Sequence, residues 1–160
     1  MRPGALRALS SGERDLAVLM FGAGLDTGRV KVLAVPVWRR AFVPHGGLMI
    51  WPAAEARLDF ADAPIPVQAV FVHELTHVWQ GQRGINLLAA KLRAGDSQAT
   101  YAYDLSDDTV FAALNIEQQA MIVQDGFLAL QGHATPYEFP AYSKIFATWL
   151  EADLTKPHDV

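Results

Sequence analysis

Apolar residues recur along much of this chain with the period of an α-helix. Between Val67 and Trp79 they return every three or four residues, and a second stripe of this kind runs from Ile116 to Leu130. A third stripe follows Pro140. This pattern places the apolar side chains on one face of each helix, so we expect three amphipathic helices that bury these faces in a common core.

Capping signals predict where helices begin. Two pairs, Ser10–Glu13 and Asn115–Gln118, have the spacing of a capping box. They predict one helix over residues 11–21 and another over residues 116–131, the second ending ahead of a glycine. A short apolar run at residues 87–92 predicts a further, shorter helix.

Two segments ahead of the 67–79 helix have the composition of β-strands. Residues 29–37 are rich in β-branched side chains, and Gly46-Gly47 is a turn signal directly before residues 48–51. We expect the two segments to pair antiparallel, with residues 48–51 either as an exposed edge that could bind a peptide or as a buried core strand. The sequence thus predicts an α+β fold that is mainly helical, with a small antiparallel sheet.

Length and composition predict one globular domain over residues 1–160. The chain is 51% apolar and 19% charged, and a domain of this size buries about two-thirds of its unfolded surface. Its formal net charge of −4 argues against a nucleic-acid partner. We expect residues 155–160 to form a frayed tail.

The sequence predicts neither a membrane span nor a cleaved signal peptide. No apolar run approaches the roughly 18 residues that a span requires. Residues 16–21 are apolar, but Glu13-Arg14-Asp15 directly precede them, which favours an amphipathic helix over a signal peptide. We therefore expect synthesis in the cytoplasm, with any export by a route that needs no cleaved leader.

The segment His73-Glu74-Leu75-Thr76-His77 lies within the first apolar stripe and has the pattern H-E-x-x-H. Residues four apart lie on the same face of a helix, so both imidazoles can bind one metal ion. Glu74 directly follows the first histidine and is placed to act as general base on a water. Because the chain has no cysteine, nitrogen and oxygen atoms would hold zinc. The alternative is a pair of histidines that only make hydrogen bonds on a buried helix.

A catalytic zinc ion normally has three protein ligands and one open position. Arg83 stands where a metzincin would have its third histidine, which excludes that class. Glu117 is the strongest candidate, because the helix dipole favours a carboxylate in a first turn and Ala120 allows close helix packing. Its alternative role is to help cap the helix. The competing ligand candidates are Asp104, Asp107, Asp108 and His133.

The sequences His73–Gln80 and Asn115–Ala120 resemble those of small bacterial gluzincin-type metallopeptidases that are described as Vgr-related proteins. The likeness extends through Leu9–Arg14, Phe21–Val30 and the glycine turn before Leu48–Trp51, so it covers most of the chain. Relatives of that group occur beside contractile injection and type VI secretion systems.

This resemblance implies a minimal zincin-like domain. His73, His77 and Glu117 would be its zinc ligands and Glu74 its general base, with secretion-system components among its partners. One position departs from the larger gluzincins, which often carry an acidic residue four positions after the glutamate ligand to hold a ligand histidine. Here that position is Met121.

Without an acidic residue at that position, other side chains must orient the histidines. Gln118, Gln119 and Asp125 are the candidates. Loss of such support typically costs about ten- to a hundredfold in metal affinity or activity.

The expected activity is zinc-dependent hydrolysis of a peptide or protein substrate. Zinc would activate a water, and Glu74 would take the proton and pass it to the leaving amine. The tetrahedral oxyanion also needs a donor. The candidates for that donor are Tyr103 and His133, with Tyr101 and Tyr137 as alternatives. Two other classes stay open: a zinc-binding adaptor of a secretion system with little or no proteolysis, and a metal-free structural domain.

Overall fold

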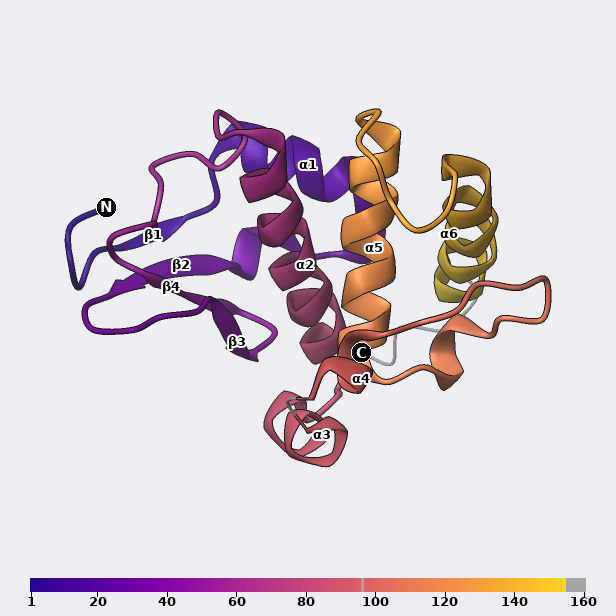
Figure 1. Cartoon of the computed structure of the whole chain (residues 1–160). Coiled ribbons are helices and arrows are strands. Elements are labelled where there is room, and N and C mark those ends of the chain that lie inside the picture. Colours follow the sequence, from indigo (N-terminus) through magenta and orange to yellow (C-terminus); the bar gives the residue numbers. More distant parts are fainter. Residues whose placement is uncertain (96, 155–160) are drawn as a thin grey trace.

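The computed structural model describes residues 1–95 and 97–154, with side chains described through Trp149. The expected frayed tail at residues 155–160 lies outside the described residues. Figure 1 shows a small sheet on one side of the molecule and helices on the other, with helix α2 (Ile65–Gln82) between them. The predicted α+β class, mainly helical, is confirmed.

The sheet has four strands in the order β1-β2-β4-β3. Strand β1 pairs antiparallel with β2, β2 pairs parallel with β4, and β4 pairs antiparallel with β3. The sheet is therefore mixed. Its strands are β1 (Leu6–Ala8), β2 (Lys31–Val35), β3 (Phe42–His45) and β4 (Leu48–Pro52).

The predicted antiparallel pairing of residues 29–37 with residues 48–51 is wrong. The Gly46-Gly47 turn does reverse the chain, but it joins β4 to β3 rather than to β2. The chain thus reverses twice between β2 and β4, and these two strands run parallel. Strand β3 was not predicted because it contains Pro44, and proline within a sheet is confined to edge strands and bulges.

The edge position predicted for residues 48–51 is also wrong, and the alternative of a core strand holds. Strand β4 lies between β2 and β3, and Met49 and Trp51 are buried. Strand β3 is the edge on this side of the sheet.

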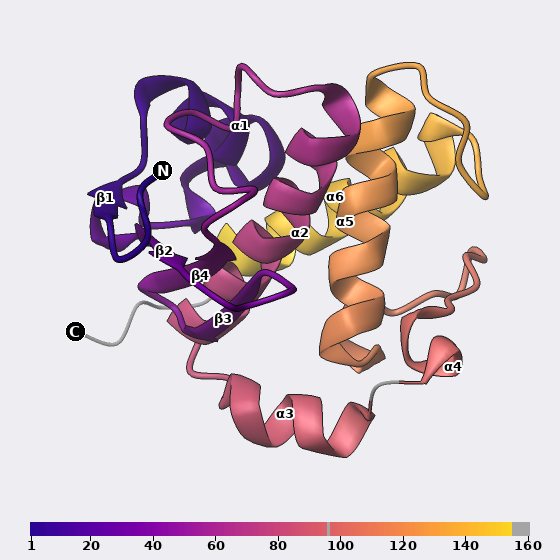
Figure 2. The same ribbon diagram turned by 60° about the vertical axis from the view of Figure 1, so that its left-hand side comes forward.

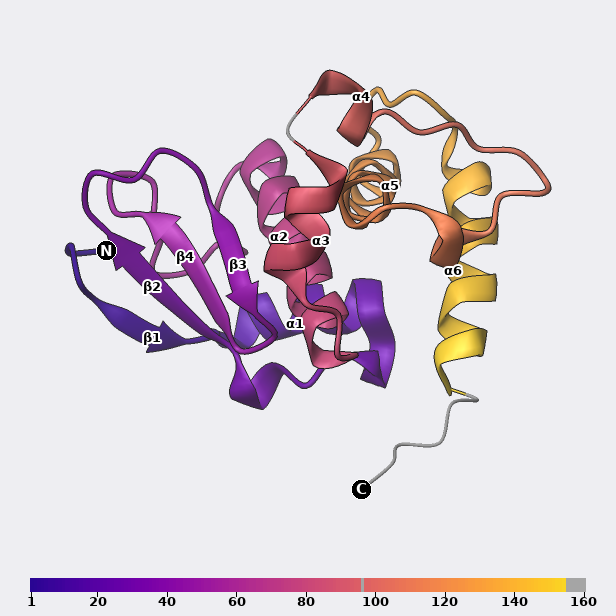
Figure 3. The same ribbon diagram turned by 90° about the horizontal axis from the view of Figure 1, so that it is seen from below.

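The helices follow the predicted boundaries closely. Capping boxes at Ser10 and Asn115 begin α1 (Ser11–Phe21) and α5 (Ile116–Leu130). The remaining helices are α3 (Leu87–Ala94), α4 (Gln98–Tyr101) and α6 (Phe139–Leu154), with 3-10 turns at Gly22–Gly24, Thr27–Arg29 and Phe111–Ala113. Figure 2 shows α2 and α5 side by side, and Figure 3 shows α3 beside the ends of both.

Helix α2 is the centre of the core. On its sheet-facing side, Phe71 stacks on Phe60, which in turn contacts the tilted ring of Trp51 in β4. Its other side packs against α5 through fully buried residues such as Val123. Along the described ranges, no helix is both long and apolar enough to cross a bilayer.

Two glycines bring the β3–β4 turn against the C-terminal part of α2. A Cβ atom on Gly46 would lie 2.5 Å from the backbone nitrogen of Gln82, and one on Gly81 would lie 2.6 Å from the backbone nitrogen of Gly46. The side-chain amide of Gln82 also donates a hydrogen bond to the Gly46 carbonyl. This close approach places edge strand β3 beside the helix that carries H-E-x-x-H.

Candidate metal centre

Helix α2 presents His73 and His77 on one face, toward α5. The ring centroids lie 4.9 Å apart with nearly perpendicular planes, and both residues are buried. This is the geometry expected for histidines four positions apart on a helix. The two rings have room for one shared partner between their Nε2 atoms.

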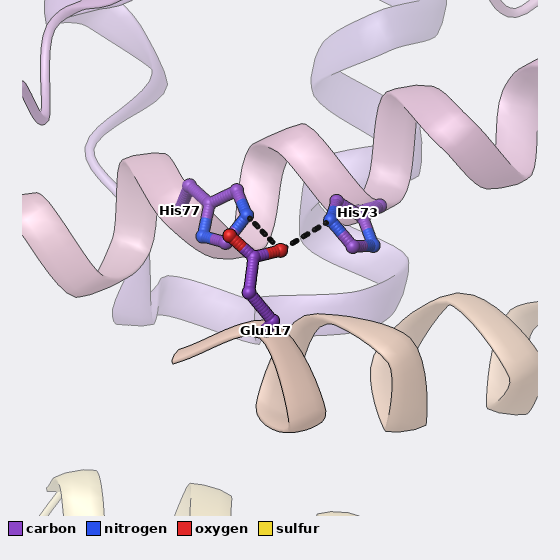
Figure 4. A group of neighbouring side chains, drawn as sticks. All are labelled: His73, His77 and Glu117. Carbon is purple, nitrogen blue, oxygen red and sulfur yellow. Dashed lines mark ion pairs between the residues drawn. The ribbon is translucent and has the colours of Figure 1, made fainter. Parts of the chain in front are cut away.

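That partner is Glu117, in the first turn of α5 (Figure 4). Its Oε2 atom lies 3.4 Å from Nε2 of His73 and 3.4 Å from Nε2 of His77. Asn115 fixes the start of the helix by accepting from the Glu117 and Gln118 amides. Ala120 is fully buried, as the predicted close helix packing requires.

The three side chains have the donor set and spacing of a metal-binding site. Each offers one ligand atom, and these atoms lie within 4.8 Å of one another. Bonds of about 2.0–2.1 Å in a tetrahedral site place neighbouring ligand atoms about 3.3–3.4 Å apart, which matches the two observed contacts. A buried group of His73, His77 and Glu117 can therefore hold a metal ion.

The charges of Glu117, His77 and Lys91 influence one another. Burial by itself would raise the pKa of Glu117, but hydrogen bonding with His73, His77 and Lys91 outweighs it and holds this pKa well below its usual range. Burial opposes a proton on His77, yet Glu117 and Glu74 favour one, and the pKa of His77 is raised. Lys91 of α3 donates to Oε1 of Glu117 at 2.8 Å.

Glu74 lies beside the metal group at the wall of a cavity. It is buried, and its Oε2 atom has no hydrogen-bond partner within the described structure. The cavity has a volume of about 810 Å³ and is bounded by β3, α2, α3 and α5. His73, His77 and Glu117 line the same space. Glu74 and the metal group thus border one cavity.

The support for His77 comes from a residue that the sequence analysis missed. Its Nδ1 atom lies 2.8 Å from Oε1 of Gln80, three positions later on α2. Gln119, one of the predicted supports, contacts Gln80 rather than a histidine. The sequence signal that could have identified Gln80 is its spacing, because a residue three positions after a ligand histidine lies on the same helix face.

The other two predicted supports have different partners. Gln118 completes the cap and donates to the Ala102 carbonyl. Asp125 accepts from Tyr103 at 2.5 Å, and burial raises the pKa of this carboxyl group. Nδ1 of His73 has no hydrogen-bond partner among the described residues.

The predicted oxyanion donors lie away from the cavity. The Tyr103 hydroxyl is held by Asp125 and Tyr142, and neither Tyr103 nor His133 lines the space. Helix α5 rises about 1.5 Å per residue, so its far end, just before His133, lies about 20 Å from Glu117. Tyr101 does line the cavity.

The competing acidic ligands are also dispersed. Asp104 accepts from Tyr137, and Asp107 pairs with Lys144 at 2.6 Å. The metal group found in the described residues contains neither of these aspartates, nor Asp108 or His133.

Known proteins resemble this chain over most of its length. No protein-family model matches the sequence. The type VI secretion system spike protein VgrG2b of Pseudomonas aeruginosa is 36% identical in an alignment of 134 residues, which covers 76% of this chain and 13% of that protein. The solved structure of the effector domain of P. aeruginosa VgrG2b superposes with a TM-score of 0.71 and 32% identity, covering 89% of this chain and 83% of that one. The chain belongs to the VgrG2b effector-domain family.

Membership of the VgrG2b effector-domain family confirms the Vgr relationship that the two sequence motifs predicted. The relationship covers the effector domain rather than the whole spike protein, because the chain spans only 13% of the length of VgrG2b. Within this member of the family, the described residues that gather as metal-ligand candidates are His73, His77 and Glu117.

Proposed function

We propose that this chain is a zinc-dependent peptidase of gluzincin type. The observation that carries the proposal is the convergence of His73, His77 and Glu117, with Oε2 of Glu117 3.4 Å from each imidazole and the buried carboxylate of Glu74 on the wall of the same cavity. Two nitrogen ligands and one oxygen ligand suit zinc and leave one position open.

Each residue has a separate task in this proposal. The two imidazoles and Oε2 of Glu117 hold zinc, which would lower the pKa of a water and polarise the scissile carbonyl. Glu74 takes the proton of the attacking water and then gives it to the leaving amine. Its Oε2 atom has no competing hydrogen-bond partner in the described structure, so it can accept that proton.

An extended peptide fits the cavity as substrate. Strand β3 is an edge strand whose residues Phe42, Val43 and Pro44 line the space, so its outer edge can bind an extended backbone by hydrogen bonding. Apolar side chains of Trp38 and Leu88 also line the cavity and are exposed. They favour a substrate with apolar side chains near the scissile bond.

The proposed oxyanion donor is Tyr101. It is the tyrosine that lines the cavity, whereas the predicted donors Tyr103 and His133 do not. A positioned hydroxyl donor of this kind typically contributes about 10² to 10³ in rate.

The family also suggests a setting for the activity. The relative VgrG2b is named as a type VI secretion system spike protein, and the matching structure is its effector domain. We propose that this chain likewise acts as an effector associated with a secretion machine, whose components are its partners.

The deciding experiment compares the parent with Glu74→Gln on an unstructured protein substrate. We expect Glu74→Gln to bind one zinc ion per chain and to lose cleavage by at least about 10²-fold, because general base catalysis contributes about 10² to 10⁴. Glu138→Gln, at an exposed position of the loop before α6, is the control and should cleave like the parent. Equal activity of Glu74→Gln and the parent would refute the mechanism. Zinc binding without cleavage by the parent would favour the adaptor function.

A further inference from the structure

The proposed zinc ligand His77 must present a bare Nε2 atom to a metal. A neutral imidazole carries its proton on either Nδ1 or Nε2, and only the Nδ1–H form leaves the Nε2 lone pair available. The acceptors that face the two nitrogens decide between the two forms. Oε2 of Glu117 lies 3.4 Å from Nε2, whereas the amide oxygen of Gln80 lies 2.8 Å from Nδ1, so the shorter contact favours the proton on Nδ1.

The chain of contacts behind Gln80 begins at Gln119. The Nε2 atom of Gln119 lies 3.0 Å from the Phe111 carbonyl oxygen and 3.2 Å from the Leu114 carbonyl oxygen. A backbone carbonyl only accepts, so the NH₂ group of Gln119 must face these two atoms. Its Oε1 atom therefore points the other way, toward Gln80.

Gln80 is oriented by two acceptors in the same manner. Its Nε2 atom lies 2.8 Å from Oε1 of Gln119 and 3.0 Å from the carbonyl oxygen of Ile116. Both require a donor, so the NH₂ group faces them and Oε1 faces His77. Gln80 is fully buried, and a reversed amide would place oxygen against oxygen without water to relieve it.

We propose that Gln80 and Gln119 form a directional amide chain that fixes His77 in the Nδ1–H tautomer and so prepares its Nε2 atom for the metal. Gln80 is a positioning residue, since it acts through His77. The chain also joins the helix of the histidines to the backbone carbonyl of Ile116, directly before the third ligand Glu117. The support that Met121 does not supply comes instead from two uncharged amides.

His73 shows by contrast what the amide chain provides. Its Nδ1 atom is buried and has no hydrogen-bond partner in the described part of the protein. The acceptor that the described structure places near this ring is Oε2 of Glu117, which lies 3.4 Å from Nε2 and not on the Nδ1 side. The difference between the two histidines makes the effect measurable within one molecule.

The test records the ¹⁵N NMR shifts of the His77 ring in the metal-free full-length chain, at a pH above the titration of His77. The parent should show a protonated Nδ1 and a bare Nε2. A protonated Nε2 in the parent would overturn the proposal by itself. The inference rests on the proposed metal site, but this readout needs neither zinc nor cleavage, so it can fail or succeed independently of peptidase activity.

Variants separate orientation from simple packing. Gln80→Met keeps the volume but removes the acceptor, so the ring should shift toward a mixture of tautomers and zinc affinity should fall about ten- to a hundredfold. Gln80→Glu keeps an acceptor for Nδ1 and should keep the Nδ1–H form, but it turns an oxygen toward the Ile116 carbonyl and Oε1 of Gln119 and should therefore lower the free energy of unfolding.

The matched control is Gln68→Met, on the same helix. The side-chain amide of Gln68 also donates two hydrogen bonds, to the Ala61 and Ala63 carbonyls, which are partly buried and lie away from the metal group. It should lose stability without changing the His77 ring shifts or the zinc affinity. Unchanged ring shifts in Gln80→Met, or an equal loss of zinc affinity in Gln68→Met, would overturn the proposal.

Discussion

The two carboxylate oxygens of Glu117 have different partners. Oε1 accepts from the Lys91 ammonium at 2.8 Å, while Oε2 lies 3.4 Å from each imidazole. Lys91 thus engages the oxygen that does not face the histidines. Because Oε1 is engaged by Lys91, we expect Glu117 to bind a metal ion through Oε2 alone. A tetrahedral zinc ion would then keep its fourth position for a water.

Glu117→Ala tests the third ligand. Mutation of a residue that only supports a ligand lowers metal affinity by up to about 100-fold. Removal of a ligand itself should lower zinc affinity by more than that. Competition with a chromophoric chelator measures the affinity, with exposed Glu138→Ala as control. Undiminished zinc affinity in Glu117→Ala would remove this residue from the site.

The pH dependence of zinc binding follows from His77. Its pKa lies above the ordinary value of 6.5 in the metal-free protein. The proton on His77 therefore stabilises the metal-free fold below that ordinary value, and the stabilisation is lost as pH rises through the raised pKa. Zinc competes with this proton, so its apparent affinity should fall about tenfold per pH unit below the raised pKa.

Thermal unfolding with and without zinc measures this effect. A ligand that binds only the native state stabilises it by about 2.7 kcal/mol at a free concentration of 100 Kd. At fixed zinc concentration, the rise in Tm caused by zinc should therefore be larger at pH 8 than at pH 6. A rise that is independent of pH would show that zinc does not displace the His77 proton.

At the scale of elements, the helices of the site were predictable and the sheet was only partly so. A capping box at Asn115 and a regular apolar stripe define α5, so the sequence placed Glu117 in a first turn facing α2. Strand pairing instead depends on which segments meet, and β3 carries Pro44 in a four-residue strand. A short, interrupted strand gives too few alternating positions to be recognised, so the strand order could not be predicted.

The close contact between α2 and the β3–β4 turn leads to a prediction about stability at Gly81. In a helix, Gly→Ala is ordinarily stabilising by about 1 kcal/mol. Here a Cβ atom would lie 2.6 Å from the backbone nitrogen of Gly46, so we expect Gly81→Ala to destabilise the fold. Overpacking of this kind costs about 1–3 kcal/mol.

Thermal or urea unfolding of Gly81→Ala checks this prediction. Gly28→Ala is the control, because among the described residues a Cβ there would meet a single atom within 4 Å, an oxygen of the exposed Asp26 side chain. It should unfold close to the parent. A Gly81→Ala chain as stable as the parent would mean that the β3–β4 turn does not rest tightly on α2.

Across the whole molecule, local patterns located the metal group and tertiary contacts determine its surroundings. His73 and His77 share a helix turn, so their spacing was enough to predict a site. Gln80 and Gln119 are 39 positions apart, and only the packing of α2 on α5 brings their amides together. The same packing sets Lys91 against Glu117 and encloses the cavity between β3 and α3.

The family relationship gives this architecture a setting. A domain of the VgrG2b effector type here carries a buried His-His-Glu group that could hold a metal ion, at an 810 Å³ cavity. We propose that a metal held by these three residues is required to cleave a peptide bond.

Metal removal and restoration test that claim most directly. The parent chain is freed of metal with a chelator, dialysed, and assayed on an unstructured protein before and after one equivalent of zinc is added. The account predicts no cleavage by the metal-free chain and recovery with zinc. Cleavage that persists without metal, or a chain that binds zinc fully and still cleaves nothing, would contradict it.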